Sequence, residues 1–159
     1  MLTTRRVVGP LRILLALAFA ALVLAQVAFL PALSGAMAED SPELAYLRWP
    51  TLTVAVLGLG CVQVVIVCTW KLLTLVEDDR IFSEASMAWV DAIVWAIGAA
   101  WLLLLGTLVW SVISVGLPGP PAVLLLVLVA VAVLGLLMVV MRALLRQATT
   151  LRTDMEAVI

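Results

Sequence analysis

Four long apolar stretches dominate the pattern of hydrophobic and polar positions along this chain. They cover residues 11–33, 52–75, 92–115 and 122–141, and each contains at most one charged side chain. A helix needs about 20 apolar residues to cross the hydrocarbon core of a bilayer. The pattern therefore predicts an all-α integral membrane four-helix bundle, with spans over about 11–33, 52–75, 85–115 and 122–141 and a cytoplasmic helical extension over 142–159.

The segments that connect the spans are short. Residues 34–51 carry three acids, residues 76–83 carry three acids and one arginine, and residues 116–121 read GLPGPP. Proline lacks a backbone donor and glycine favours turns, so this last segment cannot continue a helix. No connection is long enough to form a second domain, and we predict a single membrane domain over residues 1–159.

Composition narrows the classes of function. The chain is 66% hydrophobic and 12% charged, which excludes a water-soluble globular domain. Its net charge of −1 provides no basic surplus for direct nucleic-acid binding. Because it contains no histidine, imidazole-based catalysis, bis-imidazole haem and most zinc sites are excluded. We predict a protein that is not an enzyme and that holds no cofactor or metal.

The positive charges predict the orientation, because basic residues concentrate on the cytoplasmic side of membrane proteins. Only Arg48 lies in the first connection, and the third connection has no basic residue. The remaining eight of the nine share the side that carries both termini: Arg5, Arg6, Arg12, Lys71, Arg80, Arg142, Arg146 and Arg152. We therefore predict a multi-pass protein of the cell membrane with both termini in the cytoplasm.

The first span has a second interpretation. A basic segment ending at Arg12, an apolar stretch and the small residues around Ala38 together resemble a signal peptide with a cleavage site after Ala38. The apolar stretch is longer than the 7–15 residues typical of a signal core. We therefore expect a retained span, while cleavage after Ala38 stays open.

Lys71 and Asp91 are the charged residues placed to meet inside the bundle. Asp91 lies eight residues after Ser83, the predicted N-cap of the third helix, which is about 12 Å along its axis. Lys71 lies six residues before Glu77, near which the second helix is expected to end. We therefore predict a Lys71–Asp91 ion pair that holds these two helices together. Two alternatives stay open: a proton or ion relay, and an Asp91 side chain that reaches to water.

The segment after the fourth span carries an apolar stripe. Its members recur at steps of four and three, as on a helix that packs against a partner: Leu144, Ala148, Leu151, Met155 and Val158. We take this stripe as a candidate partner-binding tail. The fourth helix could instead run on and rest on the other inner segments, and the occupant could be a second copy of the chain or a separate protein.

Several segments resemble actinobacterial members of the membrane family catalogued as domain of unknown function 2975. The likeness rests on residues 43–50 (ELAYLRWP), on WKLL at 70–73 leading to IFS at 81–83, on Val90-Asp91, and on LRTDMEAVI at 151–159. The resemblance implies four spans and no established activity. It also implies a genetic neighbourhood with small cytoplasmic helix-turn-helix regulators. Lys71 stands where the family pattern has arginine, which keeps the charge but loses the forked geometry.

Three functions from different classes follow. The first is a non-enzymatic membrane protein that binds a cytoplasmic partner, such as a small transcription factor, through its inner loop and tail. The second is a small transporter or channel subunit, for which a water-filled cavity reaching Asp91 is the discriminating feature. The third, an enzyme of lipid or redox chemistry, has the least support, because the chain offers no histidine and no suitably placed cysteine pair.

Overall fold

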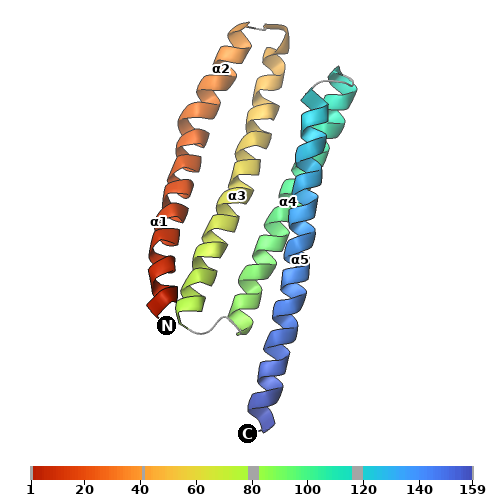
Figure 1. The fold of residues 1–159 in the computed structure, drawn as a ribbon. Coiled ribbons are helices and arrows are strands. Elements are labelled where there is room, and N and C mark those ends of the chain that lie inside the picture. The colour runs from red at the N-terminus through yellow and green to blue at the C-terminus, as the bar shows by residue number, and fades with distance from the viewer. Residues whose placement is uncertain (1, 41, 79–82, 116–119, 159) are drawn as a thin grey trace.

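The computed structural model describes residues 2–40, 42–78, 83–115 and 120–158, and the described chain is built from long helices (Figure 1). They are α1 (Leu2–Leu24), the π-helical turn η1 (Ala25–Phe29), α2 (Leu30–Asp40), the 3-10 segment η2 (Pro42–Leu47), α3 (Arg48–Glu77), α4 (Glu84–Val115) and α5 (Pro120–Val158). Four helical stretches are long and apolar enough to cross a membrane: Val8–Ala36, Arg48–Glu77, Glu84–Ser114 and Pro121–Val158. The predicted fold class is confirmed at this level.

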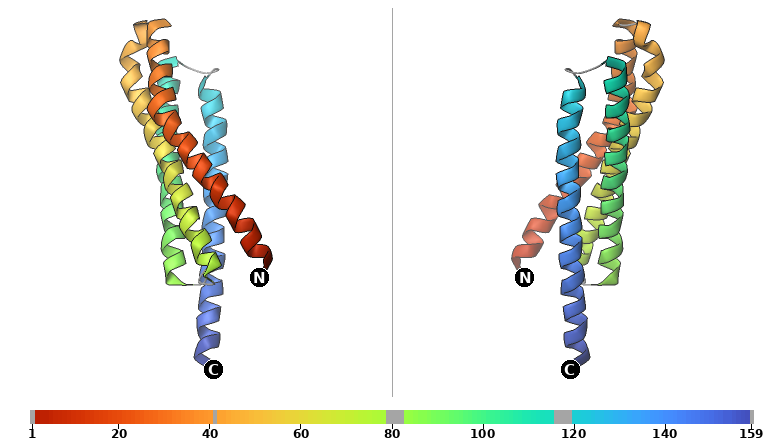
Figure 2. Two further views of the ribbon diagram at one scale, coloured as in Figure 1. Left: turned by 90° about the vertical axis from the view of Figure 1, so that its left-hand side faces the viewer. Right: turned by 90° about the vertical axis from the view of Figure 1, so that its right-hand side faces the viewer.

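The helices contact one another in the order of the chain. The α1 helix packs on α3, α3 on α4, and α4 on α5, while α2 continues the line of α1 along α3. In the side views α1 runs obliquely to α3 (Figure 2). The two chain ends lie at the same end of the molecule, together with the end of α3 and the start of α4. We call this the terminal end.

The first membrane-length stretch changes its helical form near its middle. At η1 the backbone N–H of Leu30 donates to the carbonyl of Ala25, a separation of five residues that defines a π turn. Pro31 follows directly and lacks the N–H that would reach Val27 in a regular α-helix. The π turn therefore occurs directly before the position where Pro31 removes one α-helical hydrogen bond.

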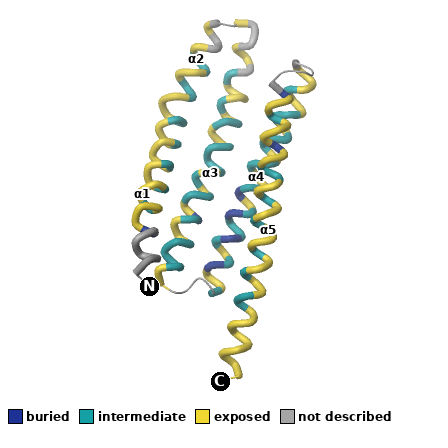
Figure 3. Tube along the Cα trace, viewed as in Figure 1, coloured by how far each residue is buried: buried dark blue, intermediate teal, exposed yellow. Residues whose placement is uncertain are grey.

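Buried residues concentrate on α4, the helix that contacts both α3 and α5 (Figure 3). Ser86 is fully buried, and Val90, Ile93 and Ala96 follow it at steps of three and four, so one face of α4 forms the centre of the core. Cys68 of α3 is also buried. By contrast, the described part of α1 contributes only Val8 to the buried set.

The helix ends agree with local sequence signals. The α3 helix ends at Glu77 and α4 begins at Glu84, one residue after the expected cap at Ser83. Both the backbone N–H and the hydroxyl of Ser86 donate to the Ser83 carbonyl, at 3.1 and 2.7 Å. Helix α5 runs without a break through the predicted membrane boundary at residue 141. Its 39 residues correspond to a length of about 58 Å.

Candidate functional site

Where the structure describes the chain, three polar contacts link the membrane-length helices in pairs. Two join α1 or η1 to α3, and the third joins α4 to α5. In hydrocarbon, such contacts stabilise helix association because apolar side chains gain little by leaving lipid for protein. Each contact is described in turn below, followed by the two surfaces that the helices leave open.

The contact between α4 and α5 is an ion pair between Asp91 and Arg142. The Nη2 of Arg142 donates to Oδ2 of Asp91 at 2.9 Å, and its Nε faces Oδ1. The guanidinium thus contacts both carboxylate oxygens, through one hydrogen bond to Oδ2 and a close charge contact at Oδ1. Both side chains remain about one-third exposed in the isolated chain. The arrangement neutralises a carboxylate that would otherwise be costly at the edge of an apolar layer.

This contact corrects the predicted partner of Asp91. Lys71 lies on the side of α3 that meets α1, whereas α4 lies on another side of α3 and turns Asp91 toward α5. Among the described residues, no ion pair joins Lys71 to Asp91. Lys71 and Arg142 both lie near the terminal end, so depth in the bundle does not distinguish them as partners of Asp91. The direction in which each side chain leaves its helix determines the pairing.

Arg12 forms the main polar contact between α1 and α3. Its Nη2 lies 2.6 Å from Oε2 of Glu77 and donates to the hydroxyl of Thr74 at 3.1 Å. Its guanidinium carbon also lies 6.0 Å from the ring centre of Trp70, within the range of a cation–π interaction. The sequence did not predict this contact, although an arginine inside an apolar stretch is a signal that it needs a partner.

Two glutamines form a second contact, between η1 and α3, farther from the terminal end than the Arg12 contact. The side-chain amide of Gln63 donates to Oε1 of Gln26 at 2.9 Å, and Nε2 of Gln26 donates to the carbonyl of Val56 at 3.2 Å. Gln26 lies in the π turn η1, where the backbone departs from α-helical spacing.

A groove lies between α1 and α3 near the terminal end. It encloses about 290 Å³. Its walls are Leu15, Ala16 and Phe19 from α1 and Ile66, Val67, Trp70 and Lys71 from α3. We call it the α1–α3 groove. Among the described residues of its lining, Lys71 alone is charged, and the remaining side chains are apolar or aromatic.

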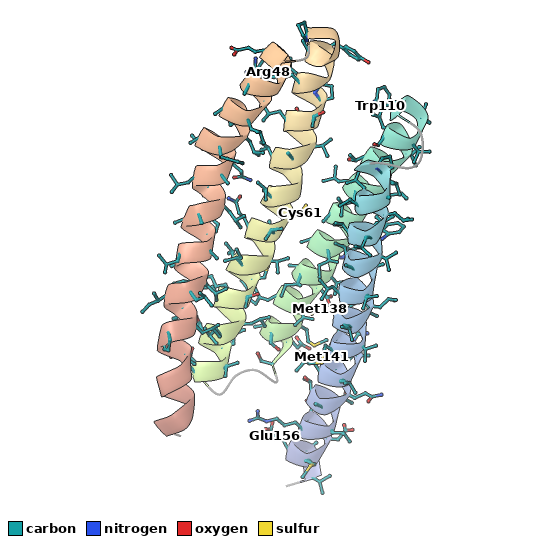
Figure 4. The ribbon with its side chains drawn as sticks, turned by 45° about the horizontal axis from the view of Figure 1, so that its top comes forward. Arg48, Cys61, Trp110, Met138, Met141 and Glu156 are labelled. Carbon is teal, nitrogen blue, oxygen red and sulfur yellow. The ribbon has the colours of Figure 1, made fainter. Side chains whose placement is uncertain are left out.

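The last turns of α5 extend past the terminal ends of α3 and α4, as Glu156 illustrates in Figure 4. The apolar stripe lies on this extension and is largely open. Leu144, Leu151, Met155 and Val158 are 54%, 64%, 69% and 87% exposed, and Ala148 is half-buried. The extension therefore does not rest on the other helices over this face. Within the chain, Arg152 Nε contacts Glu156 at 3.2 Å.

A second hollow, of about 670 Å³, lies beside the stripe on α5. Polar side chains line much of it: Arg142, Arg146, Gln147 and Thr150, together with Val139, Ala143 and Leu151. Arg146 makes no ion pair with any residue that the structure describes. This part of the extension therefore combines an open apolar stripe with a cationic flank.

The described residues include side chains that could serve as metal ligands or as reactive thiols. Over residues 2–40, 42–78, 83–115 and 120–158, no three side chains of Cys, Asp and Glu lie close enough together to hold a metal ion. Cys61 and Cys68 are free thiols on α3 (Figure 4 labels Cys61). Two ion pairs join different helices: Arg12 with Glu77, and Asp91 with Arg142.

Comparison with known families agrees with this architecture. Residues 32–159 match the family described as "Protein of unknown function (DUF2975)". The chain belongs to this family. The DUF2975 match begins in α2 and covers α3, α4 and α5, including the Asp91–Arg142 pair and the whole helical extension. Neither the curated proteins nor the solved structures provide a match to the chain.

Proposed function

We propose that this DUF2975 protein is a non-enzymatic multi-pass membrane protein that binds a cytoplasmic protein through the extension of α5. The observation that carries the proposal is the exposed stripe from Leu144 to Val158. An apolar stripe of this kind in water marks an interaction surface. The orientation rests on the predicted cytoplasmic placement of the terminal end.

The spacing of the stripe and the charge beside it indicate what kind of partner would bind the extension. The 4-3 spacing of the stripe fits an amphipathic helix that packs alongside it with the same periodicity. Arg146 on the flank favours an acidic residue at the edge of that partner helix. We therefore expect an amphipathic helix with an acidic margin, carried by a soluble protein. A small transcription regulator is the kind of partner that the family resemblance implies.

The membrane helices supply the anchor for this interaction. Asp91 is held by Arg142 and does not line the α1–α3 groove or the hollow beside the stripe. Its carboxylate therefore supports α5 from within the molecule. On this proposal, the ion pair fixes the helix from which the extension projects.

The test is site-specific photocrosslinking in native membranes. A photoreactive residue at Leu151 should form an adduct with one soluble protein, and the crosslinked peptide should come from an amphipathic helix with an acidic margin. Removal of residues 149–159 should abolish the association and leave membrane insertion intact. The matched control places the photoreactive group at Thr153, which is exposed but lies outside the stripe, and should give no adduct.

Charge reversal at Arg146 tests whether the partner helix has an acidic margin. Arg146→Glu should weaken the association, and replacing the partner's facing acid with lysine should restore it. Two results would overturn the proposal: an adduct whose mass equals two copies of this chain, or an association that survives both the deletion and Arg146→Glu.

A further inference from the structure

The α1–α3 groove has the polarity of a phospholipid. Lys71 and Trp70 lie at its terminal end, about 9 Å along α3 from Glu77. From there the walls continue away from the terminal end to Phe19 on α1 and Ile66 on α3. Because α1 and α3 run in opposite directions, these two residues both lie deeper in the predicted span. The groove thus passes from one cation and one interfacial aromatic to purely apolar walls.

Among the described residues, the charge at the mouth of the groove is not balanced. Glu77 is engaged by Arg12, so these two opposite charges neutralise each other. Lys71 is exposed and has no ion-pair partner among the residues that the structure describes. A positive charge therefore stays available at the depth where a lysine side chain can extend to the headgroup layer. Trp70 lies beside it and suits the same layer, because indole rings favour the membrane interface.

We propose that the α1–α3 groove binds one acidic phospholipid. The headgroup phosphate meets the ammonium of Lys71, and an acyl chain lies along the apolar walls formed by Leu15, Phe19 and Val67. A basic site between membrane helices on the cytoplasmic side is suited to anionic headgroups. A zwitterionic lipid carries its own cation near the phosphate, so it gains less from Lys71. The proposal rests on the membrane placement given above and not on the partner of the extension.

Native mass spectrometry of the detergent-solubilised full chain tests the site. The probe is an equal mixture of phosphatidylglycerol and phosphatidylcholine with identical acyl chains. One lysine near a membrane surface corresponds to a preference of about fivefold for the acidic lipid. Lys71→Gln should remove this preference. Ala16→Phe, which fills the groove, should reduce the binding of both lipids.

Arg146→Gln is the matched control, because it removes a cation on α5, away from the groove, that has no ion-pair partner among the described residues. It should leave the preference unchanged. Each variant's thermal unfolding midpoint in detergent shows whether its fold is intact. Equal binding of the two lipids by the unaltered chain would overturn the proposal, and so would a preference that survives Lys71→Gln. Either failure leaves the crosslinking result at Leu151 unaffected, so the two proposals fail separately.

Discussion

The junction between α1 and α3 differs from the junction between α4 and α5 in what fills it. Beyond Val8, α1 contributes no buried side chain among the residues whose burial is described, and its contacts to α3 depend on Arg12 and on Gln26 of the adjoining η1. The α4–α5 junction combines the close approach of Gly135 to Ile97 with an ion pair. Polar links hold the first junction, whereas close packing and a polar link together hold the second.

The difference follows from the physics of helix association in lipid. Apolar side chains gain little by moving from lipid to protein, so close backbone approach and polar bonds decide which helices associate. Gly135 shows the close approach directly: a Cβ built on it would lie 3.2 Å from Cγ2 of Ile97 on α4. The described glycines of α3 show no such approach to another helix. We therefore expect α1 to separate from the other helices before α5 does.

The largest effect is expected when the ion pair of the α4–α5 junction is broken. Arg142→Met leaves the Asp91 carboxylate without its cation at the edge of the apolar layer, which should lower the free energy of unfolding by about 2 kcal/mol. Unfolding in mixed micelles measures this change. Arg146→Met is the control four residues along the same helix, and it should change stability by less than about 0.5 kcal/mol. Equal losses in the two variants would contradict the assigned role of Arg142.

A glycine comparison tests the close packing of the same junction. Gly135→Ala forces a methyl group against Ile97, whereas Gly106→Ala on α4 meets nothing within 4 Å in the chain. The added methyl should make the Gly135 variant less stable than the Gly106 variant by about 1–2 kcal/mol. Thermal unfolding of the two variants in the same detergent gives the comparison. A Gly135 variant as stable as the Gly106 variant would show that the helices do not approach closely there.

A smaller effect is expected at the α1–α3 junction. Gln26→Leu removes the amide that bonds Gln63 and Val56, and should cost about 0.6–1 kcal/mol. Spin labels on α1 and α3 should report a longer or broader distance distribution in this variant. Gln147→Leu, on the exposed extension, should leave that distribution unchanged. If Gln26→Leu also leaves it unchanged, the glutamine pair does not hold the junction.

The smallest effect is expected outside both junctions. The Arg152–Glu156 pair lies on the extension, and its side chains are 51% and 68% exposed. Because water screens exposed pairs of this kind, Glu156→Gln should change stability by no more than about 0.5 kcal/mol. The same unfolding assay measures it. A loss as large as that of Arg142→Met would show that the distinction between junction and surface ion pairs does not hold.

The sequence predicted the fold better than it predicted the contacts. Four apolar runs, the helix end at Glu77 and the start of α4 beside Ser83 follow from hydropathy and capping, which are local properties. The partner of Asp91 was wrong because the choice between Lys71 and Arg142 depends on the order in which the helices pack. The Gln26–Gln63 bond was missed because the π turn alters the register that a regular helix would give.

The central claim is that Asp91 holds α4 to α5 through Arg142 and not to α3 through Lys71. Two double-mutant cycles test it, one combining Asp91→Leu with Arg142→Met and the other combining Asp91→Leu with Lys71→Met. The free energies of unfolding should give a coupling of about 1–3 kcal/mol for Asp91 with Arg142, and less than about 0.5 kcal/mol for Asp91 with Lys71. A larger coupling with Lys71, or none with Arg142, would contradict the account.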